Sequence, residues 1–369
     1  MVGAGIVGAA AARELAVRGV KVTLLDRGAV SGGTTGLGEG NVLCSDKDAG
    51  PELHLARAGL AVYGELEERL GDEARIRRKG ALIVHPEAGT WAAERARLDC
   101  MAIPGARLVP PDEVRALEPE LTGRLHGASL FPDDLQCDPR AIARALAREA
   151  ARAGATVREG CPVTAIATEG GRVLGVHTAA GLVAAEAVVI AAGPWSAALA
   201  TSAGLRLPLE PRKGQLVRLA APAPGLVRHK VVDGSYLASV ASGGSALEVS
   251  TVVETTWEGD VLVGSSRERR GFDTRVDPAV SDAMVVRAAR LFPGLARLPV
   301  AAAWAGLRPW LPDHRPAIGP SSAVAGLWLA TGHEGAGVAL GPVTGRLIAQ
   351  LYTGEAPVVE PAPFQPDRF

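Results

Sequence analysis

The sequence has few aromatic residues, no surplus of charge and no long apolar run, and each shortage excludes a class of protein. Aromatic residues make up 4% of the 369 residues, and the formal net charge is −1. Because no basic stretch is interleaved with aromatic residues, we do not expect a nucleic-acid partner. Glycine, proline or charge interrupts every apolar segment well short of the roughly twenty residues that a membrane helix needs. The sequence therefore predicts no membrane span.

Cysteine is also scarce. The four cysteines are widely spaced, form no Cys-x-x-Cys pair and have no histidine beside them at ligand spacing: Cys44, Cys100, Cys137 and Cys161. This pattern predicts no metal site, neither structural zinc nor an iron–sulfur cluster. We interpret the four residues as reduced thiols and expect a cytoplasmic protein.

What the sequence does contain is a glycine motif at its beginning. "GAGIVG" places glycine at positions 3, 5 and 8, an apolar helical run follows to Val17, and "VKVTLLD" has the composition of a strand. This order predicts a βαβ unit that binds a dinucleotide, in which the first glycine permits the turn, the second lets the backbone approach a pyrophosphate and the third lets helix and strand pack closely. The expected contacts are Gly3, Gly5, Ile6, Val7 and Gly8.

An acidic residue ends the second strand of this unit. Asp26 can accept hydrogen bonds from the two hydroxyls of a ribose, which favours an unphosphorylated adenosine ribose. Its neighbour Arg27 is expected to contact the cofactor as well. The motif alone leaves open whether the dinucleotide is NAD or FAD.

The first strand of the motif is unusually short. Only Met1 and Val2 precede Gly3, whereas strands commonly run about five or six residues. We expect the natural protein to begin several residues upstream with a short apolar strand. The alternative is that Met1 is the true start and a shortened strand suffices.

Later segments of the sequence are predicted to return to the domain that contains the βαβ unit. Apolar residues at three- and four-residue intervals predict a helix from Leu53 to Leu70, and Asp138 followed by Pro139 predicts the capped start of another. The apolar run 187–191 predicts a strand buried on both faces, and it leads into Gly193 and Trp195. Such a second close approach to the cofactor favours the bulkier flavin dinucleotide over NAD.

The remaining pattern predicts a second, inserted unit. Alternating β-branched residues from 211 to 274 predict an antiparallel sheet, with a helix near 281–292. The fold class is therefore α/β, a Rossmann-like FAD-binding domain with an inserted antiparallel-sheet substrate domain. We assign 1–80, 136–211 and 300–355 to the first domain, 81–135 and 212–299 to the second, and 356–369 to a C-terminal tail.

Together these segments resemble a known family. "VGAGIVG…LLDR", "GGTTGLGEGNVL", "VVIAAGPWS", "PRKGQ", "GLRPWLPDHRPAIG" and "GLWLATGHEGAGVALGPVTG" are similar to the D-amino-acid oxidase-like (DAO) superfamily of FAD-dependent oxidoreductases. Within it, the chain looks most like the group of glycine oxidases, D-hydroxyproline dehydrogenases and catalytic subunits of opine oxidases and hydrogen cyanide synthase. The likeness covers nearly the whole chain.

The resemblance implies an activity. It implies oxidation of the C–N bond of a small amino or imino acid (glycine-like, D-amino acid, D-proline or hydroxyproline, or opine), with hydride passing to flavin N5 and the imine hydrolysing. FAD should be noncovalent, because Gly306 stands where some relatives carry the attaching cysteine. Partner subunits carrying flavin or iron–sulfur groups are a further expectation.

The resemblance also implies site residues. Arg308 matches the arginine that clamps the substrate carboxylate, since a guanidinium binds a carboxylate bidentately. Tyr236 could cover the pocket or simply pack in the sheet. His333 could tune the flavin or only bond a backbone carbonyl. Expected flavin contacts, with a turn-forming role as the alternative for the threonines, are Thr34, Thr35, Gly332, Gly335, Ala336, Gly337 and Val338.

Two other functions stay open at this point. A relative that oxidises a 2-hydroxy acid would share FAD and Arg308 but would need a base, for which His333 is the candidate. A non-catalytic FAD subunit that only relays electrons is the second.

Overall fold

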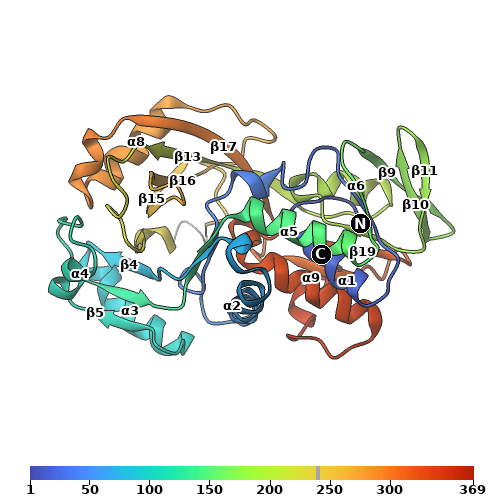
Figure 1. The fold of residues 1–369 in the computed structure, drawn as a ribbon, viewed down its shortest axis with the longest axis horizontal. Coiled ribbons are helices and arrows are strands. Elements are labelled where there is room, and N and C mark those ends of the chain that lie inside the picture. Colours follow the sequence, from blue (N-terminus) through green and yellow to red (C-terminus); the bar gives the residue numbers. More distant parts are fainter. Residues whose placement is uncertain (238–241) are drawn as a thin grey trace.

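The computed structural model of the protein describes residues 1–237 and 242–369. Figure 1 shows two halves side by side. One half contains both ends of the chain, α1 and α9, and the other contains a large sheet with α8 above it and α3 and α4 below. No helix in the described part of the chain combines the length and apolarity needed to cross a membrane.

The half with the chain ends is built on short parallel strands. Val2 forms parallel bridges to Leu25 on one side and Ile190 on the other, so the first residues join two groups of strands into one layer. β8 pairs with β1 in parallel, β19 pairs with β12 in parallel, and β18 pairs with β19 antiparallel. The strands are β1 (Thr23–Leu25), β8 (Thr156–Arg158), β12 (Val188–Ile190), β18 (Ala317–Pro320) and β19 (Leu327–Thr331).

A group of helices covers one side of this layer. α1 (Ile6–Val17) packs between α5 (Pro139–Arg152) and α9 (Gly337–Thr353), and α2 (Pro51–Leu70) packs on α9. The run Ala9 to Ala12 is completely buried at these contacts, because small side chains let the helices approach closely. The predicted cap of α5 is confirmed, since the Asp138 carboxylate accepts hydrogen bonds from two backbone N–H groups of the first turn.

The other half is an eight-stranded sheet in the order β17-β13-β16-β15-β14-β4-β6-β5. Every neighbouring pair in it is antiparallel except β14 and β4, so the predicted antiparallel sheet is nearly correct. α8 (Pro278–Ala289) covers one face, beginning three residues before the expected position at a cap formed by Asp277. The strands are β4 (Ala81–His85), β5 (Arg107–Val109), β6 (Gly127–Phe131), β13 (Glu210–Leu219), β14 (Lys230–Asp233), β15 (Glu248–Thr255), β16 (Val261–Arg267) and β17 (Val300–Trp310).

Smaller elements complete the two halves. β9 (Val163–Glu169), β10 (Arg172–Thr178) and β11 (Gly181–Ala184) form a meander, and β2 (Asn41–Val42), β7 (Leu135–Cys137) and β3 (Ile76–Arg77) form a small sheet. The region 81–135 holds two helices, α3 (Ala88–Met101) and α4 (Pro111–Leu117). α6 (Ser196–Ser202) follows the second glycine turn. The domain boundaries stay predictions, and β17, placed by prediction in the FAD-binding domain, is the edge strand of the large sheet.

Candidate active site

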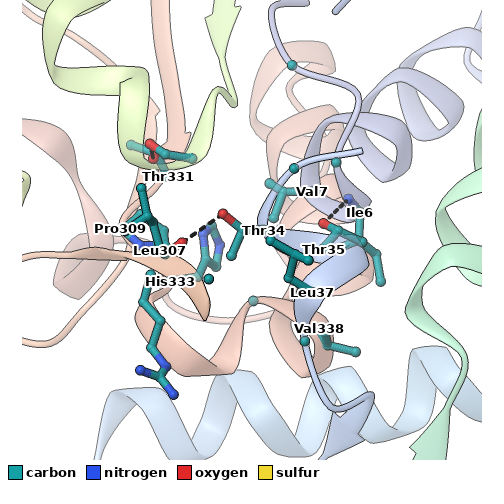
Figure 2. A pocket seen from close by; sticks show the side chains of 18 of the residues that line it. Ile6, Val7, Thr34, Thr35, Leu37, Leu307, Pro309, Thr331, His333 and Val338 are labelled. Atoms are coloured by element: carbon teal, nitrogen blue, oxygen red, sulfur yellow. Dashed lines mark hydrogen bonds between the residues drawn. The ribbon is translucent and has the colours of Figure 1, made fainter. Parts of the chain in front are cut away.

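A cavity of about 540 Å³ lies between the parallel layer and the eight-stranded sheet. This volume is within the range of small-molecule and cofactor sites. Its walls come from the glycine motif, the segment from Gly32 to Lys47, the turn at Gly193, the sheet residues from Gly306 to Pro309 and the loop from His333 to Ala339. Figure 2 draws 18 of the lining residues and labels ten of them.

The glycine motif forms one end of the cavity. Gly3 has φ +103°, and a Cβ there would overlap the backbone of Ala191, so only glycine fits the turn. Gly5 lies on the cavity wall just before the N-terminus of α1. Gly8 does not line the cavity, and a Cβ at Gly8 would overlap the carbonyl of Gly3. The first and third glycines thus serve close packing, and the second exposes its backbone to the cavity, where a Cβ would be 3.0 Å from the Thr35 hydroxyl.

Asp26 lies at this end as expected. Its carboxylate accepts hydrogen bonds from the backbone N–H of Ala4 (2.7 Å) and of Gly28 (2.8 Å). An ionised carboxylate has about four acceptor positions, so two remain for ribose hydroxyls. The Asp26 side chain therefore both holds the turn and faces the cavity.

The two threonines connect the halves of the site. The Thr35 hydroxyl accepts from the backbone N–H of Ile6 (3.0 Å), and the Thr34 hydroxyl donates to the carbonyl of Leu307 (2.8 Å), as Figure 2 shows. Thr35 thereby satisfies one of the N–H groups that a helix start leaves without a partner. Both hydroxyls thus bond to distant parts of the chain, and both residues line the cavity. Their contact with the cofactor stays a prediction.

The second glycine turn also lies on the cavity. Gly193 has φ +53°, and Trp195 follows it with the Arg27 guanidinium 3.6 Å from its ring centroid. The other neighbour of Trp195 is Phe272, whose ring lies 5.8 Å away at an interplanar angle of 24°. Trp195 and Arg27 therefore form one stacked wall.

The last predicted loop leads into α9. Gly335, Ala336, Gly337 and Val338 line the cavity, whereas Gly332 packs against Leu311 away from it. The N-terminus of α9 at Gly337 thus faces the cavity, where its dipole favours negative charge.

His333 is a buried, neutral side chain. It lies on the cavity wall, but its Nε2 is 2.9 Å from the hydroxyl of Thr344 inside α9. Burial lowers the pKa of His333 to about 3. A histidine with an engaged ring nitrogen and such a low pKa is poorly suited to act as a base.

Arg308 lies on β17 beneath this loop. Its Nη1 donates to the carbonyl of Ser266 (3.0 Å), and no carboxylate among the described residues lies within ion-pair distance of it. Burial and the neighbouring Arg267 lower the pKa of Arg308 to about 10, so the guanidinium stays protonated at neutral pH. Tyr236 lines the same part of the cavity, and its ring lies 4.5 Å from the guanidinium carbon of Arg267.

Sequence analysis missed charged residues at the site. Glu39 lines the cavity and pairs with Lys230, with 2.7 Å between Oε2 and Nζ. Glu334, in the predicted loop, accepts from Arg212 Nη1 (2.7 Å) and lies 3.0 Å from His314 Nδ1. A charge between two glycines, as in "GEG", was the available sign for Glu39, but nothing local marks Lys230 or Arg212.

The residues fit a flavin dinucleotide. The acceptor positions of Asp26 suit a ribose. The exposed backbone at Gly5 and the N-terminus of α1 suit a pyrophosphate, and the N-terminus of α9 suits an electron-rich ring. The cavity continues without interruption from Asp26 to Arg308, so a long cofactor and a small substrate share one space.

Comparison with known proteins agrees with this arrangement. The model of the DAO family, described as FAD-dependent oxidoreductase, matches residues 1–351. The chain belongs to the DAO family. It is 32% identical over 373 residues to glycine oxidase of Pseudomonas aeruginosa, covering 99% of this chain and 97% of that protein. It is also 31% identical to hydrogen cyanide synthase subunit HcnC of the same organism, over 86% of this chain and 72% of that protein.

A solved structure is similar over the whole chain as well. The crystal structure of iminodiacetate oxidase from Chelativorans sp. BNC1 superimposes with a TM-score of 0.86 at 27% identity, covering 99% of this chain and 98% of that one. The predicted α/β fold, the FAD cofactor and FAD-dependent oxidation of a small amino or imino acid are confirmed.

Proposed function

We propose that this chain oxidises the C–N bond of a small amino or imino acid whose carboxylate binds Arg308. The observation that supports this is the Arg308 guanidinium, which faces the cavity without a carboxylate partner among the described residues. A buried guanidinium favours a bound carboxylate, because a paired charge costs less than an isolated one. The similar glycine oxidase and iminodiacetate oxidase suggest glycine and N-carboxymethyl amino acids as substrates.

The chain's own residues position the substrate. FAD, when bound, supplies the acceptor for the hydride of the α-carbon. Arg308 fixes the carboxylate, and Tyr236 bounds the cavity beside it. We assign the predicted cofactor contacts that line the cavity to FAD, with Gly8 and Gly332 supporting it through packing. Positioning of this kind supplies much of the rate when no protein base is required.

The two rival functions are less well supported. A 2-hydroxy acid loses its hydroxyl proton only to a base, and His333 is directed to Thr344 and kept neutral by burial. An electron-relay subunit has no use for an unpaired arginine at the end of the FAD cavity. Both observations favour the amino-acid oxidoreductase.

We also propose a cytoplasmic location and a redox partner. The four cysteines are free thiols, which is typical of proteins in reducing compartments. The relative HcnC is a subunit of a larger enzyme, so a partner carrying flavin or iron–sulfur groups could accept the electrons of this chain.

An anaerobic reduction screen tests the proposed function. The FAD-loaded protein is mixed without oxygen with glycine, sarcosine, D-alanine, D-proline and iminodiacetate, and with the matched hydroxy acids glycolate and D-lactate. We expect at least one amino acid to bleach the flavin absorbance and the hydroxy acids to leave it unchanged. Bleaching by the hydroxy acids alone, or by none of these compounds, contradicts the proposal.

A further inference from the structure

Two side chains of opposite charge, Arg308 and Glu39, pack against glycines of the eight-stranded sheet where it lines the cavity. The Arg308 side chain lies over Gly214 of β13, where a Cβ would overlap its Nη1. The Glu39 carboxylate lies over Gly264 of β16, where a Cβ would be 2.7 Å from its Oε1. The two charged side chains occupy the space that side chains at these glycine positions would fill, so both lie against the face of the sheet. Both also line the cavity.

One oxygen of Glu39 is engaged and the other is available. Oε2 accepts from Lys230 Nζ (2.7 Å) and from Asn41 Nδ2 (2.5 Å). In residues 1–237 and 242–369, no donor bonds to Oε1. The Glu39 side chain keeps 14% of its surface exposed, toward the cavity that it lines.

Glu39 is ionised at neutral pH. Burial alone would raise its pKa, but Lys230, Arg308 and Asn41 outweigh burial and lower the pKa below its usual value. Lys230 is itself almost completely buried on β14, so the carboxylate is held by a buried side chain of the sheet. The site thus presents a fixed anionic acceptor on the same sheet face as the cationic Arg308.

We propose that Glu39 binds the amine of the substrate, with Oε1 accepting a substrate N–H while Arg308 holds the carboxylate. This inference rests on the proposed function and narrows the substrate class to amino acids that keep at least one N–H, primary or secondary. A positively charged amine makes a charge-assisted hydrogen bond to Glu39, whereas the hydroxyl of a hydroxy acid makes only an ordinary one. Glu39 therefore selects amino acids over hydroxy acids of the same shape.

A matched pair of ligands that cannot be oxidised isolates the amine. 2-Aminoisobutyrate and pivalate have the same carboxylate and nearly the same shape, but only the first has an amine, and neither has an α-hydrogen. Their dissociation constants are measured from the change in flavin absorbance of the FAD-loaded protein. We expect the wild type to bind 2-aminoisobutyrate more tightly than pivalate.

Two variants then test Glu39 itself. Glu39→Gln should weaken 2-aminoisobutyrate about tenfold to a hundredfold, as expected for loss of a hydrogen bond to a charged group, and leave pivalate unchanged or tighter. Gly264→Ala keeps every charge but crowds the Glu39 carboxylate (2.7 Å) and the Leu216 side chain (2.8 Å), so it should act in the same direction. Glu94→Gln is the matched control: it removes a buried carboxylate that pairs with Arg97 (2.7 Å) outside the cavity lining, and should preserve the preference.

The inference is overturned if the wild type does not prefer 2-aminoisobutyrate to pivalate. It is equally overturned if Glu39→Gln and Gly264→Ala keep that preference, or weaken both ligands alike, since Glu39 would then only neutralise Lys230. Failure of the proposed function is distinguishable, because it appears as absence of flavin reduction by amino acids in the wild type.

Discussion

Arg212 and Glu334 form a buried ion pair across the site, with 2.7 Å between Nη1 and Oε1. Arg212 lies on β13 and is 1% exposed, and Glu334 lies in the loop that leads to α9. Glu334 has φ +46°, a conformation that side chains other than glycine rarely adopt. The ion pair thus fastens a strained loop to the large sheet beside Arg308.

Substitution of Glu334 should separate the effect of the ion pair on stability from the effect of the left-handed backbone strain. Glu334→Ala leaves the Arg212 guanidinium buried without a partner, and we expect a loss of about 3–5 kcal/mol in the free energy of unfolding. Glu334→Gly loses the same ion pair but removes the left-handed strain, so it should be about 1–2 kcal/mol more stable than Glu334→Ala. Urea denaturation of the FAD-loaded proteins measures both. Equal stability of the two variants would show that the backbone at residue 334 is not strained.

Substitution of Arg308 should affect the substrate and spare the cofactor. Arg308→Ala removes a charge-assisted contact, so we expect carboxylate inhibitors to bind about tenfold to a hundredfold more weakly while the flavin spectrum stays nearly unchanged. Arg308→Lys should restore binding only in part, because an ammonium cannot pair bidentately. Titration with acetate and pivalate provides the measurement. If carboxylates bound Arg308→Ala as tightly as the wild type, Arg308 would not be the residue that binds the substrate carboxylate.

Substitution of Asp26 should weaken FAD. Asp26→Ala removes the expected ribose acceptor together with the bonds to Ala4 and Gly28, so we expect a loss of about 1–3 kcal/mol in FAD binding. Asp26→Asn keeps one acceptor oxygen and should lie between the alanine variant and the wild type. Fluorescence titration of the apoprotein with FAD compares the three. FAD affinity that does not depend on residue 26 would exclude it from the site.

The flavin should be released intact by acid. Gly306 lies on the cavity wall, and glycine cannot form a thioether. After precipitation of the purified protein with acid, we expect all of the yellow colour in the supernatant and a mass equal to that of FAD. Colour retained in the washed pellet would show a covalent bond.

Burial of His333 should make stability depend on pH. Its pKa is about 3 in the folded protein and near 6.5 when unfolded. Between these values only the unfolded chain binds the proton, so the free energy of unfolding should fall as the pH decreases, by up to about 1.4 kcal/mol per pH unit.

The matched variants are His333→Asn and His126→Asn. The first should flatten the stability profile between about pH 4 and 6 relative to the wild type, and the second, at an exposed position, should keep the wild-type slope. Denaturation series at several pH values compare them. An unchanged slope in His333→Asn would show that His333 is not the group responsible.

The elements that follow local rules were predictable. The glycine spacing at the start of the chain, the apolar periodicity of α2 and the cap of α5 by Asp138 each depend on residues within a few positions, and the structure has all three. Gly193 and the loop before α9 were also predicted to contact the cofactor, and in the structure both line the cavity. Glycine-rich turns after buried strands mark a close approach of the backbone to a ligand.

The charge pairs of the site were decided by the tertiary structure. Glu39 and Lys230 are 191 positions apart, and Arg212 and Glu334 are 122 apart. By itself the sequence determined a dinucleotide-binding fold, since turns, helix caps and strand periodicity are local properties of the chain. Which carboxylates neutralise which buried cations, and which oxygen of Glu39 is left for a substrate, depended on the register of β13, β14 and β16, because only sheet pairing brings distant residues to one face.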